Sequence, residues 1–273
     1  MSAGKIRKPK ATGEPNKYPN PAEDEDRASR RIADAGSDFG MPLKTDVGKK
    51  KSSPAKQGPV NPPTYNPLDR KNLGRSVADA LLQTEPIPLR GIARFRGAGI
   101  YALYYTGSHP AYGEIAKRNR DGFFLLPIYV GKAVPAGARK GHLGEGIDPG
   151  QVLVKRLQEH EESIRQAPTL DLDDFWCRFV VVEDIWIPLG ESLLIAKYSP
   201  LWNKMLDGFG NHDPGAGRYQ GLRPKWDVLH PGRSWADKCR ARSETSTQIQ
   251  TELQAHLRLS SLPPIPTLLG TDE

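Results

Sequence analysis

The sequence predicts a small α/β domain of the α+β kind, in which helices pack on a three-stranded sheet. Three apolar runs rich in aromatic and β-branched residues, at 99–105, 123–131 and 174–183, predict the strands. Helical periodicity over 151–167 and an apolar run at 188–198 that opens with proline predict two helices. The resulting order, β-β-α-β-α, is typical of folds in which helices cover a small sheet.

Composition separates a tail from the folded part of the chain. The chain has 273 residues and a net charge of +7. Residues 1–60 hold 13 Lys and Arg against 8 Asp and Glu, with almost no large apolar side chains, so we expect a disordered basic tail there. Most of the net charge therefore lies outside the predicted fold, and charge alone is weak support for a nucleic-acid-binding core.

Cysteine content and hydropathy predict a cytoplasmic protein. Cys177 and Cys239 are too few for a disulfide framework and fit a reducing compartment. No apolar run approaches the roughly 20 residues needed to span a membrane, and the N-terminus has no apolar signal core. We expect no membrane partner.

Residues 61–96 are predicted to form an N-terminal arm and a helix. Prolines and asparagines at 61–75 indicate an extended arm. Ser76 is the predicted N-cap of a short helix that runs through Leu82 and stops before Pro86.

Two polar segments are longer than a simple connection between strands and helices requires. A hairpin between the first two strands needs about 2–5 loop residues, yet 107–122 is much longer, which favours a functional or partner-contacting element. After the second strand, 131–150 is rich in glycine and basic residues. Beyond the predicted core at 97–206, residues 207–262 are loop-like, with a final helix at 243–259, and 263–273 is expected to fray.

Six side chains of the predicted core form a set that suits phosphodiester cleavage. They are Tyr101, Tyr129, Arg156, His160, Glu191 and Asn203. A single carboxylate can hold Mg²⁺, an arginine can pair with phosphate oxygens, and histidine or tyrosine can relay a proton from the attacking water. The sequence shows no zinc-ligand spacing, phosphate-binding glycine loop or nucleophilic-serine elbow.

Each of these residues also has a purely structural interpretation. The tyrosines suit ordinary strand positions, and the arginine and histidine, four apart, suit a solvated helix face. The glutamate suits the positive end of its helix, and the asparagine suits a turn. Only the combination carries the functional interpretation.

The combination occurs in a specific order. That order is Gly99-Ile100-Tyr101 on the first strand, Tyr129-Val130-Gly131 on the second, Arg156-x-x-x-His160 on the next helix, Glu191 on the following helix, and Asn203 twelve positions later. Over about residues 97–205 the chain thereby resembles the GIY-YIG nucleases. It is most similar to their type II restriction endonuclease branch, which shares the Arg-x-x-x-His form, a long insertion and a C-terminal recognition segment. Two departures are the valine in the second triplet and the N-terminal tail.

The resemblance implies a mostly antiparallel sheet and hydrolysis of both DNA strands with one divalent metal per active site. Mg²⁺ is the expected ion and Mn²⁺ the alternative. The products would carry a 5′-phosphate and a 3′-hydroxyl.

The resemblance also implies a role for each motif residue. Tyr101 would activate or orient the attacking water, with His160 as proton acceptor, because an unperturbed tyrosine is a poor base at neutral pH. Arg156 would stabilise the transition state, and Glu191 would ligate the metal. Tyr129 and Asn203 would position the scissile phosphate and support the site, respectively.

The expected partner is double-stranded DNA, cut by a homodimer whose two-fold axis matches a palindromic site. Relatives in this branch cut CCGCGG, and the arginine-rich stretch at 217–242 suits such a GC-rich target. A cognate DNA methyltransferase is expected to protect the host. Ten basic residues are the candidate DNA contacts. They are Arg94, Arg96, Lys117, Arg118, Arg120, Lys132, Arg218, Arg223, Lys225 and Arg233.

Three other functions fit parts of the pattern. A homing or repair nuclease would share the motif but carry a separate recognition module, and none is evident here. A DNA-binding protein on the same fold would bind without cleaving, although all six chemical positions are present. A basic α/β domain could instead bind RNA through exposed aromatic side chains.

Overall fold

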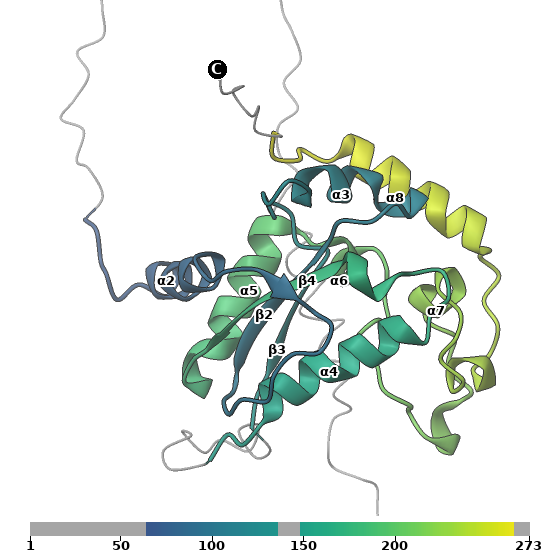
Figure 1. Cartoon of the computed structure of the whole chain (residues 1–273), viewed down its shortest axis with the longest axis horizontal. Helices are drawn as coiled ribbons and strands as arrows, with labels where there is room; N and C mark the ends of the chain where they lie inside the picture. The colour runs from purple at the N-terminus through teal and green to yellow at the C-terminus, as the bar shows by residue number, and fades with distance from the viewer. Residues whose placement is uncertain (1–63, 136–147, 265–273) are drawn as a thin grey trace, which may run out of the picture. The chain divides into compact units, whose positions relative to one another are not determined.

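The computed structural model describes residues 64–135 and 148–264 (Figure 1). The predicted tail at 1–60, most of the glycine-rich loop at 131–150 and the end of the chain lie outside the described residues. None of the described helices is long and apolar enough to cross a bilayer.

An antiparallel sheet of order β1-β4-β2-β3 lies at the centre of the fold (Figure 1). β2 (Gly99–Tyr105) pairs with β3 (Tyr129–Ala133) on one side and with β4 (Phe175–Val181) on the other. The three predicted strands are therefore present, and the third of them, β4, lies inside the sheet between β1 and β2.

The sheet also has a fourth strand that the sequence did not predict. β1 (Ile87–Pro88) is only two residues long and pairs with the outer edge of β4, with Ile87 opposite Cys177. Proline is tolerated there because an edge strand does not need every backbone N–H.

The second strand was predicted to begin too early. The run at 123–131 becomes a strand only at Tyr129, because the backbone turns at Phe124, which has a φ of 43°. The residues just before Tyr129 are held by a side chain and not by hydrogen bonds to a neighbouring strand. Buried Asn119 donates to Leu126 O and accepts from Leu126 N, both at 2.9 Å.

All seven residues of β2 are buried because both faces of the sheet are covered. Ile100, Ala102 and Tyr104 pack under α2 (Arg70–Leu82) and α5 (Ile187–Tyr198). The alternate residues, beginning with Tyr101, pack against the other cluster. The helices that contribute to it include α4 (Val152–Arg165), α6 (Leu201–Lys204), α7 (Lys225–Leu229) and α8 (Ser246–Leu259). Period-two alternation of a strand with two apolar faces produces this division.

The helix of the N-terminal arm begins earlier than predicted. Its N-cap is Asp69, whose Oδ1 accepts a 2.8 Å hydrogen bond from Lys71 N, so Ser76 lies inside the helix rather than at its start. Aspartate is a strong N-cap residue, and the sequence reading missed it. The final helix begins at a capping box formed by Thr245 and Gln248.

The insertion between β2 and β3 is helical and not a loop. It contains η1 (Pro110–Tyr112) and α3 (Gly113–Asn119), which lie beside α8 (Figure 1). The other single-turn elements are η3 (Leu172–Asp174), η4 (Asp184–Trp186), η5 (Ala216–Arg218) and η6 (Ala236–Lys238).

Candidate active site

The fold brings Tyr101 of β2 and His160 of α4 into direct contact. Tyr101 Oη lies 2.6 Å from His160 Nε2, and both side chains are buried. His160 therefore shares the inward face of α4 with Leu157 and Ile164, and the solvated-face interpretation is wrong for it.

Burial sets the protonation of this pair. It raises the pKa of Tyr101 well above its usual value, and neighbouring Tyr129 adds to the rise while the Arg156 guanidinium opposes it. It lowers the pKa of His160 well below its usual value, and the positive charge of Arg156 lowers it further. At neutral pH the pair is thus a protonated phenol beside a neutral imidazole, which can accept the phenolic proton.

The sheet register leaves no room for a side chain beside Tyr101. Gly131 of β3 lies opposite Tyr101, and a Cβ at residue 131 would lie 2.3 Å from Tyr101 Oη. Gly131, which ends the second triplet, is therefore needed at this position. A larger residue there would collide with the side chain of Tyr101, the tyrosine of the first triplet, which lies across β3.

Tyr129 completes an aromatic group around the histidine. Its ring centroid lies 6.2 Å from that of Tyr101 and 5.3 Å from that of His160. Burial raises the pKa of Tyr129, and the Arg156 guanidinium opposes this rise.

Arg156 lies at the edge of this group and is held by three contacts. Its Nη1 donates to Glu159 Oε2 at 3.0 Å and to His212 Nε2 at 2.6 Å, and its Nη2 donates to Gly210 O at 2.7 Å. Arginine only donates hydrogen bonds, so His212 Nε2 is the acceptor in this contact. The guanidinium is therefore held in one orientation at the site.

Glu191 of α5 faces a cation. Its Oε2 lies 2.6 Å from Lys132 Nζ of β3, and the Glu191 side chain is 16% exposed. It is close enough to both motif tyrosines to raise their pKa values. A partly exposed carboxylate that already accommodates a positive charge is a suitable ligand for a hard divalent cation.

The donor set fits an ion that keeps most of its water. Within the described ranges, 64–135 and 148–264, no three His, Cys, Asp or Glu side chains form a metal-binding group. Mg²⁺ binds in this manner, through one or two carboxylates together with water and phosphate oxygens.

Asn203 bonds to the outer edge of β3. Its Oδ1 accepts from Val130 N and its Nδ2 donates to Val130 O, both at 2.8 Å. The side chain thus takes the place of a neighbouring strand at the residue between Tyr129 and Gly131. It fixes the position of both.

Phe209 also lies at the site, although the sequence reading did not select it. Its ring stacks on that of His160, with centroids 4.6 Å apart and planes at 14°, and meets Tyr129 edge-on at 5.1 Å. His212, which accepts a hydrogen bond from Arg156, is the second site residue that was not predicted from the sequence. The only signal in the sequence was an isolated aromatic residue in the polar glycine-rich loop that follows α6.

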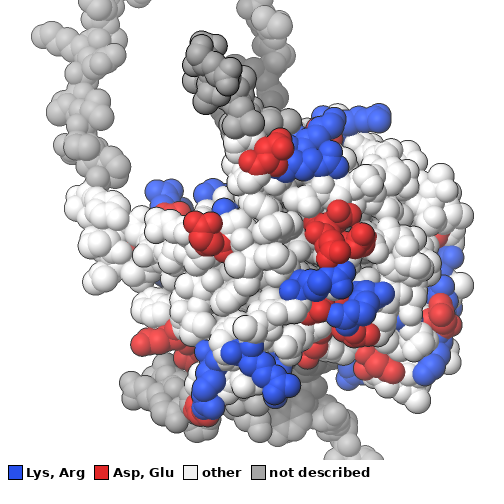
Figure 2. Space-filling view, in the orientation of Figure 1, with Lys and Arg blue, Asp and Glu red and all other residues white. Residues whose placement is uncertain are grey.

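The predicted DNA-contacting residues divide by exposure. Five are exposed: Arg94, Arg96, Lys117, Arg120 and Arg218. Several of the ten bond within the protein: Arg118 Nε donates to Pro263 O, Arg120 Nε donates to Thr106 O, Lys225 pairs with Glu252, and Lys132 pairs with Glu191. Figure 2 shows basic and acidic side chains interleaved on one face of the molecule, in keeping with the small excess of positive charge outside the tail.

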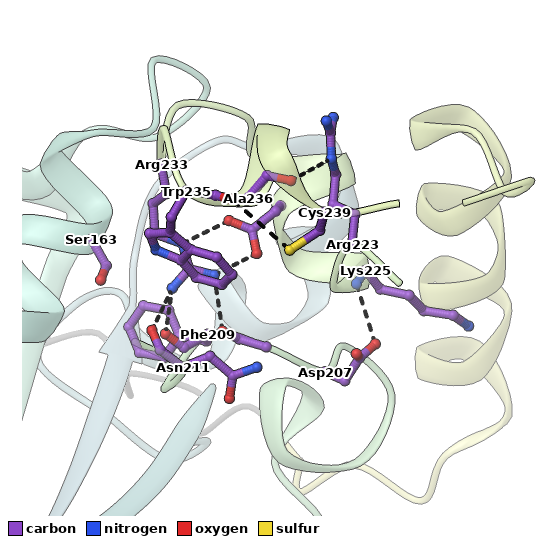
Figure 3. A network of polar contacts seen from close by, with 12 residues as sticks. Ser163, Asp207, Phe209, Asn211, Arg223, Lys225, Arg233, Trp235, Ala236 and Cys239 are labelled. Atoms are coloured by element: carbon purple, nitrogen blue, oxygen red, sulfur yellow. Dashed lines mark hydrogen bonds and ion pairs between the residues drawn. The ribbon is translucent and has the colours of Figure 1, made fainter. Parts of the chain in front are cut away.

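Arg233 does not fit its predicted role. Its side chain is 2% exposed and pairs with Asp227 at 2.6 Å. The interpretation of Arg233 as a DNA-contacting residue is therefore wrong for this conformation, because its charge is enclosed and already compensated. The network around it is drawn in Figure 3.

Comparison with known proteins identifies the family. A family model described as the Eco29kI GIY-YIG domain matches residues 93–257, which is more than half of the chain. No curated protein matches the chain. The matched range includes all six motif residues and the Phe209 loop. The chain therefore belongs to the Eco29kI GIY-YIG family, whose members are DNA-cleaving nucleases of the restriction type.

Proposed function

We propose that this nuclease is a type II restriction endonuclease that cuts both strands of DNA at a GC-rich palindrome, with one Mg²⁺ per active site. The observation that carries the proposal is the buried contact between Tyr101 and His160, beside Arg156 and near Glu191. Eco29kI cuts CCGCGG, and we propose the same site here.

In the proposed mechanism, a water molecule attacks the scissile phosphorus while its proton passes to Tyr101 Oη. The phenolic proton passes at the same time to His160 Nε2, which burial keeps unprotonated at neutral pH. This relay avoids a free tyrosinate, which the buried position of Tyr101 disfavours. The bond from phosphorus to the 3′ oxygen breaks, this oxygen takes a proton from solvent to become the 3′-hydroxyl, and the phosphate stays on the 5′ side.

The remaining motif residues bind and orient. Arg156 would pair with oxygens of the scissile phosphate, where the negative charge grows. Tyr129 would position the same phosphate, and Asn203 would support it by fixing β3. Glu191 would hold the metal, which when bound supplies positive charge for the transition state. Lys132, which pairs with Glu191, would hold this carboxylate at the site.

We further propose a homodimer, with one site for each strand of the palindrome, and a cognate methyltransferase that protects the host DNA. DNA and dimer contacts would come from three segments: the arm at 61–82, the insertion at 107–122 and the exposed basic residues of 208–242. Residues 97–206 would form the catalytic core.

A plasmid assay tests the function. The substrates are a plasmid with one CCGCGG site and the same plasmid with that site altered, each incubated with Mg²⁺ or with EDTA. We expect linear product only from the first plasmid with Mg²⁺. Sequencing of the ends gives the cut positions and the end chemistry.

Two variants sharpen this assay. Glu191→Ala should abolish cutting, whereas Glu162→Ala, which removes an exposed carboxylate on α4 that pairs with Arg165, should leave it unchanged. Cutting at a different sequence would refute only the CCGCGG assignment. Intact plasmid under every condition, together with retarded duplex in a gel, would refute the endonuclease proposal and indicate a non-cleaving DNA-binding protein.

A further inference from the structure

Arg233 and Asp227 form a buried ion pair beside the candidate active site. Arg233 Nε and Nη2 each lie 2.6 Å from one oxygen of the Asp227 carboxylate, and both side chains are almost fully enclosed. The guanidinium carbon lies 4.5 Å from the Trp226 ring centroid and 4.8 Å from that of Trp235. The guanidinium is therefore held by the carboxylate along one edge and lies close to two aromatic rings.

The other donors of Arg233 hold the loop that follows α6 (Figure 3). Its Nη1 donates to Phe209 O at 3.0 Å and to Asn211 O at 3.1 Å, and its Nη2 donates to Gly208 O at 2.9 Å. With the two bonds to Asp227, all five N–H donors of Arg233 are used inside the protein. Three loop carbonyls therefore depend on one side chain.

The same loop supplies contacts to the motif residues. Phe209 stacks on His160 and meets Tyr129 edge-on, while Gly210 O and His212 Nε2 accept from Arg156. Any shift of the loop would move the ring that covers the imidazole and release the guanidinium together. The loop thus links the orientation of the proposed proton acceptor to that of the proposed phosphate ligand.

We propose that Arg233, fixed by Asp227, is a positioning residue for DNA cleavage, which holds the 208–211 loop so that Phe209 orients His160 and Gly210 O orients Arg156. The inference rests on the proposed function, since it assigns those two residues their roles in cleavage. It also explains why a charged pair occupies an apolar cluster. Such a pair is weak evidence for stability, and apolar residues often replace it without loss.

The test variant is Arg233→Lys. Lysine keeps the charge opposite Asp227, but its three donors cannot bond the carboxylate and three loop carbonyls together. We expect the single-turnover rate of cleavage at saturating DNA to fall at least about tenfold, and the dissociation constant for DNA without metal to stay within about twofold. Arg178→Lys is the control, because Arg178 is half-buried and its guanidinium also lies against an aromatic ring, that of Tyr104, on the other face of the sheet.

A second readout does not depend on cleavage. The titration of the His160 imidazole is followed by NMR in the wild-type protein and in Arg233→Lys. Looser packing of Phe209 admits water to the imidazole, so the variant should titrate at higher pH, and the acid limb of its pH–rate profile should shift in the same direction. If Arg233→Lys does not fold, Phe209→Leu removes the same stacking contact and should give both changes.

Three results would overturn the proposal. A lower melting temperature with unchanged rate and unchanged His160 titration would make the ion pair merely structural. Weaker DNA binding with an unchanged rate at saturation would make Arg233 a DNA contact. An unchanged titration of His160 in both variants would remove the link through Phe209. If the wild-type protein cuts no DNA, the proposed function fails, and the NMR titration still decides whether Arg233 positions His160.

Discussion

Tyr101 Oη and His160 Nε2 lie 2.6 Å apart in the interior, where β2 meets α4. The hydrogen bond joins the first triplet of the motif to the helix that carries the Arg-x-x-x-His motif, and both side chains are buried. In the proposed mechanism a proton crosses this contact at every turnover.

Removing the phenolic hydroxyl should abolish the relay. Tyr101→Phe is expected to lower the single-turnover rate by at least about 100-fold, the usual scale of a lost acid–base group. The control is Tyr104→Phe, which removes the hydroxyl of a buried tyrosine on the opposite face of the same strand. Equal rates for both variants would refute the role of Tyr101.

Cleavage should persist to unusually low pH. His160 must be neutral to accept a proton, and burial with nearby Arg156, His212 and Arg233 lowers its pKa. The midpoint of the acid limb of the single-turnover rate should therefore lie below about pH 6.5, the value for an unperturbed histidine. A midpoint above that pH would contradict the assignment of His160 as proton acceptor.

The free energy of unfolding should also decrease as the pH is lowered. Between the lowered pKa in the folded protein and about 6.5 in the unfolded chain, the unfolded chain binds a proton that the folded protein does not. The free energy of unfolding is then undiminished above about pH 6.5 and falls as the pH is lowered through that window. Buried His230, whose pKa is also lowered, adds to the fall. Urea denaturation across this range measures it, and greater stability at acid pH would contradict the sign.

Substitution of Gly210 tests whether two side-chain atoms of the site must be held in place. A Cβ there would lie 2.8 Å from Tyr129 Oη and 2.9 Å from Arg156 Nη2, so Gly210→Ala should displace one of these atoms. We expect cleavage to fall roughly tenfold through misplacement, with little change in melting temperature. Gly217→Ala is the control, because a Cβ there meets nothing within 4 Å. Full activity of Gly210→Ala would show that these atoms need not be held in place.

Asn203 should stabilise the fold as well as the site. In Asn203→Asp the carboxylate faces Val130 O and cannot donate to it, which should lower the free energy of unfolding by about 1–3 kcal/mol. Cleavage should fall as well, because Tyr129 and Gly131 flank Val130. Asn72→Asp, at a hydrogen bond near the surface of α2, should change neither property appreciably. Chemical denaturation and the plasmid assay measure the two effects.

The sequence predicted the strands and helices that carry the motif residues, because these elements depend on local patterns. Alternating aromatic residues and a helical stripe are properties of neighbouring positions. Other features depend on residues distant in the chain. β1 exists because β4 offers it an edge, and the backbone at Leu126 is held by Asn119.

The loop that contains Phe209 shows most clearly what the sequence alone does not predict. In the sequence, Arg233 is one of several arginines in a basic stretch, and nothing local separates it from those at the surface. Only the folded chain places Asp227 and three carbonyls around it. The count of basic residues therefore overstated the charge available to DNA.

Asn203 has a consequence for assembly. By occupying the hydrogen-bonding groups of Val130, it stops the sheet of one molecule from continuing into that of another at this point of β3. In the proposed homodimer, the two copies would therefore meet through surfaces other than this point of β3. The spacing of their two cuts on opposite DNA strands would then be set by those surfaces and not by the strand spacing of a shared sheet.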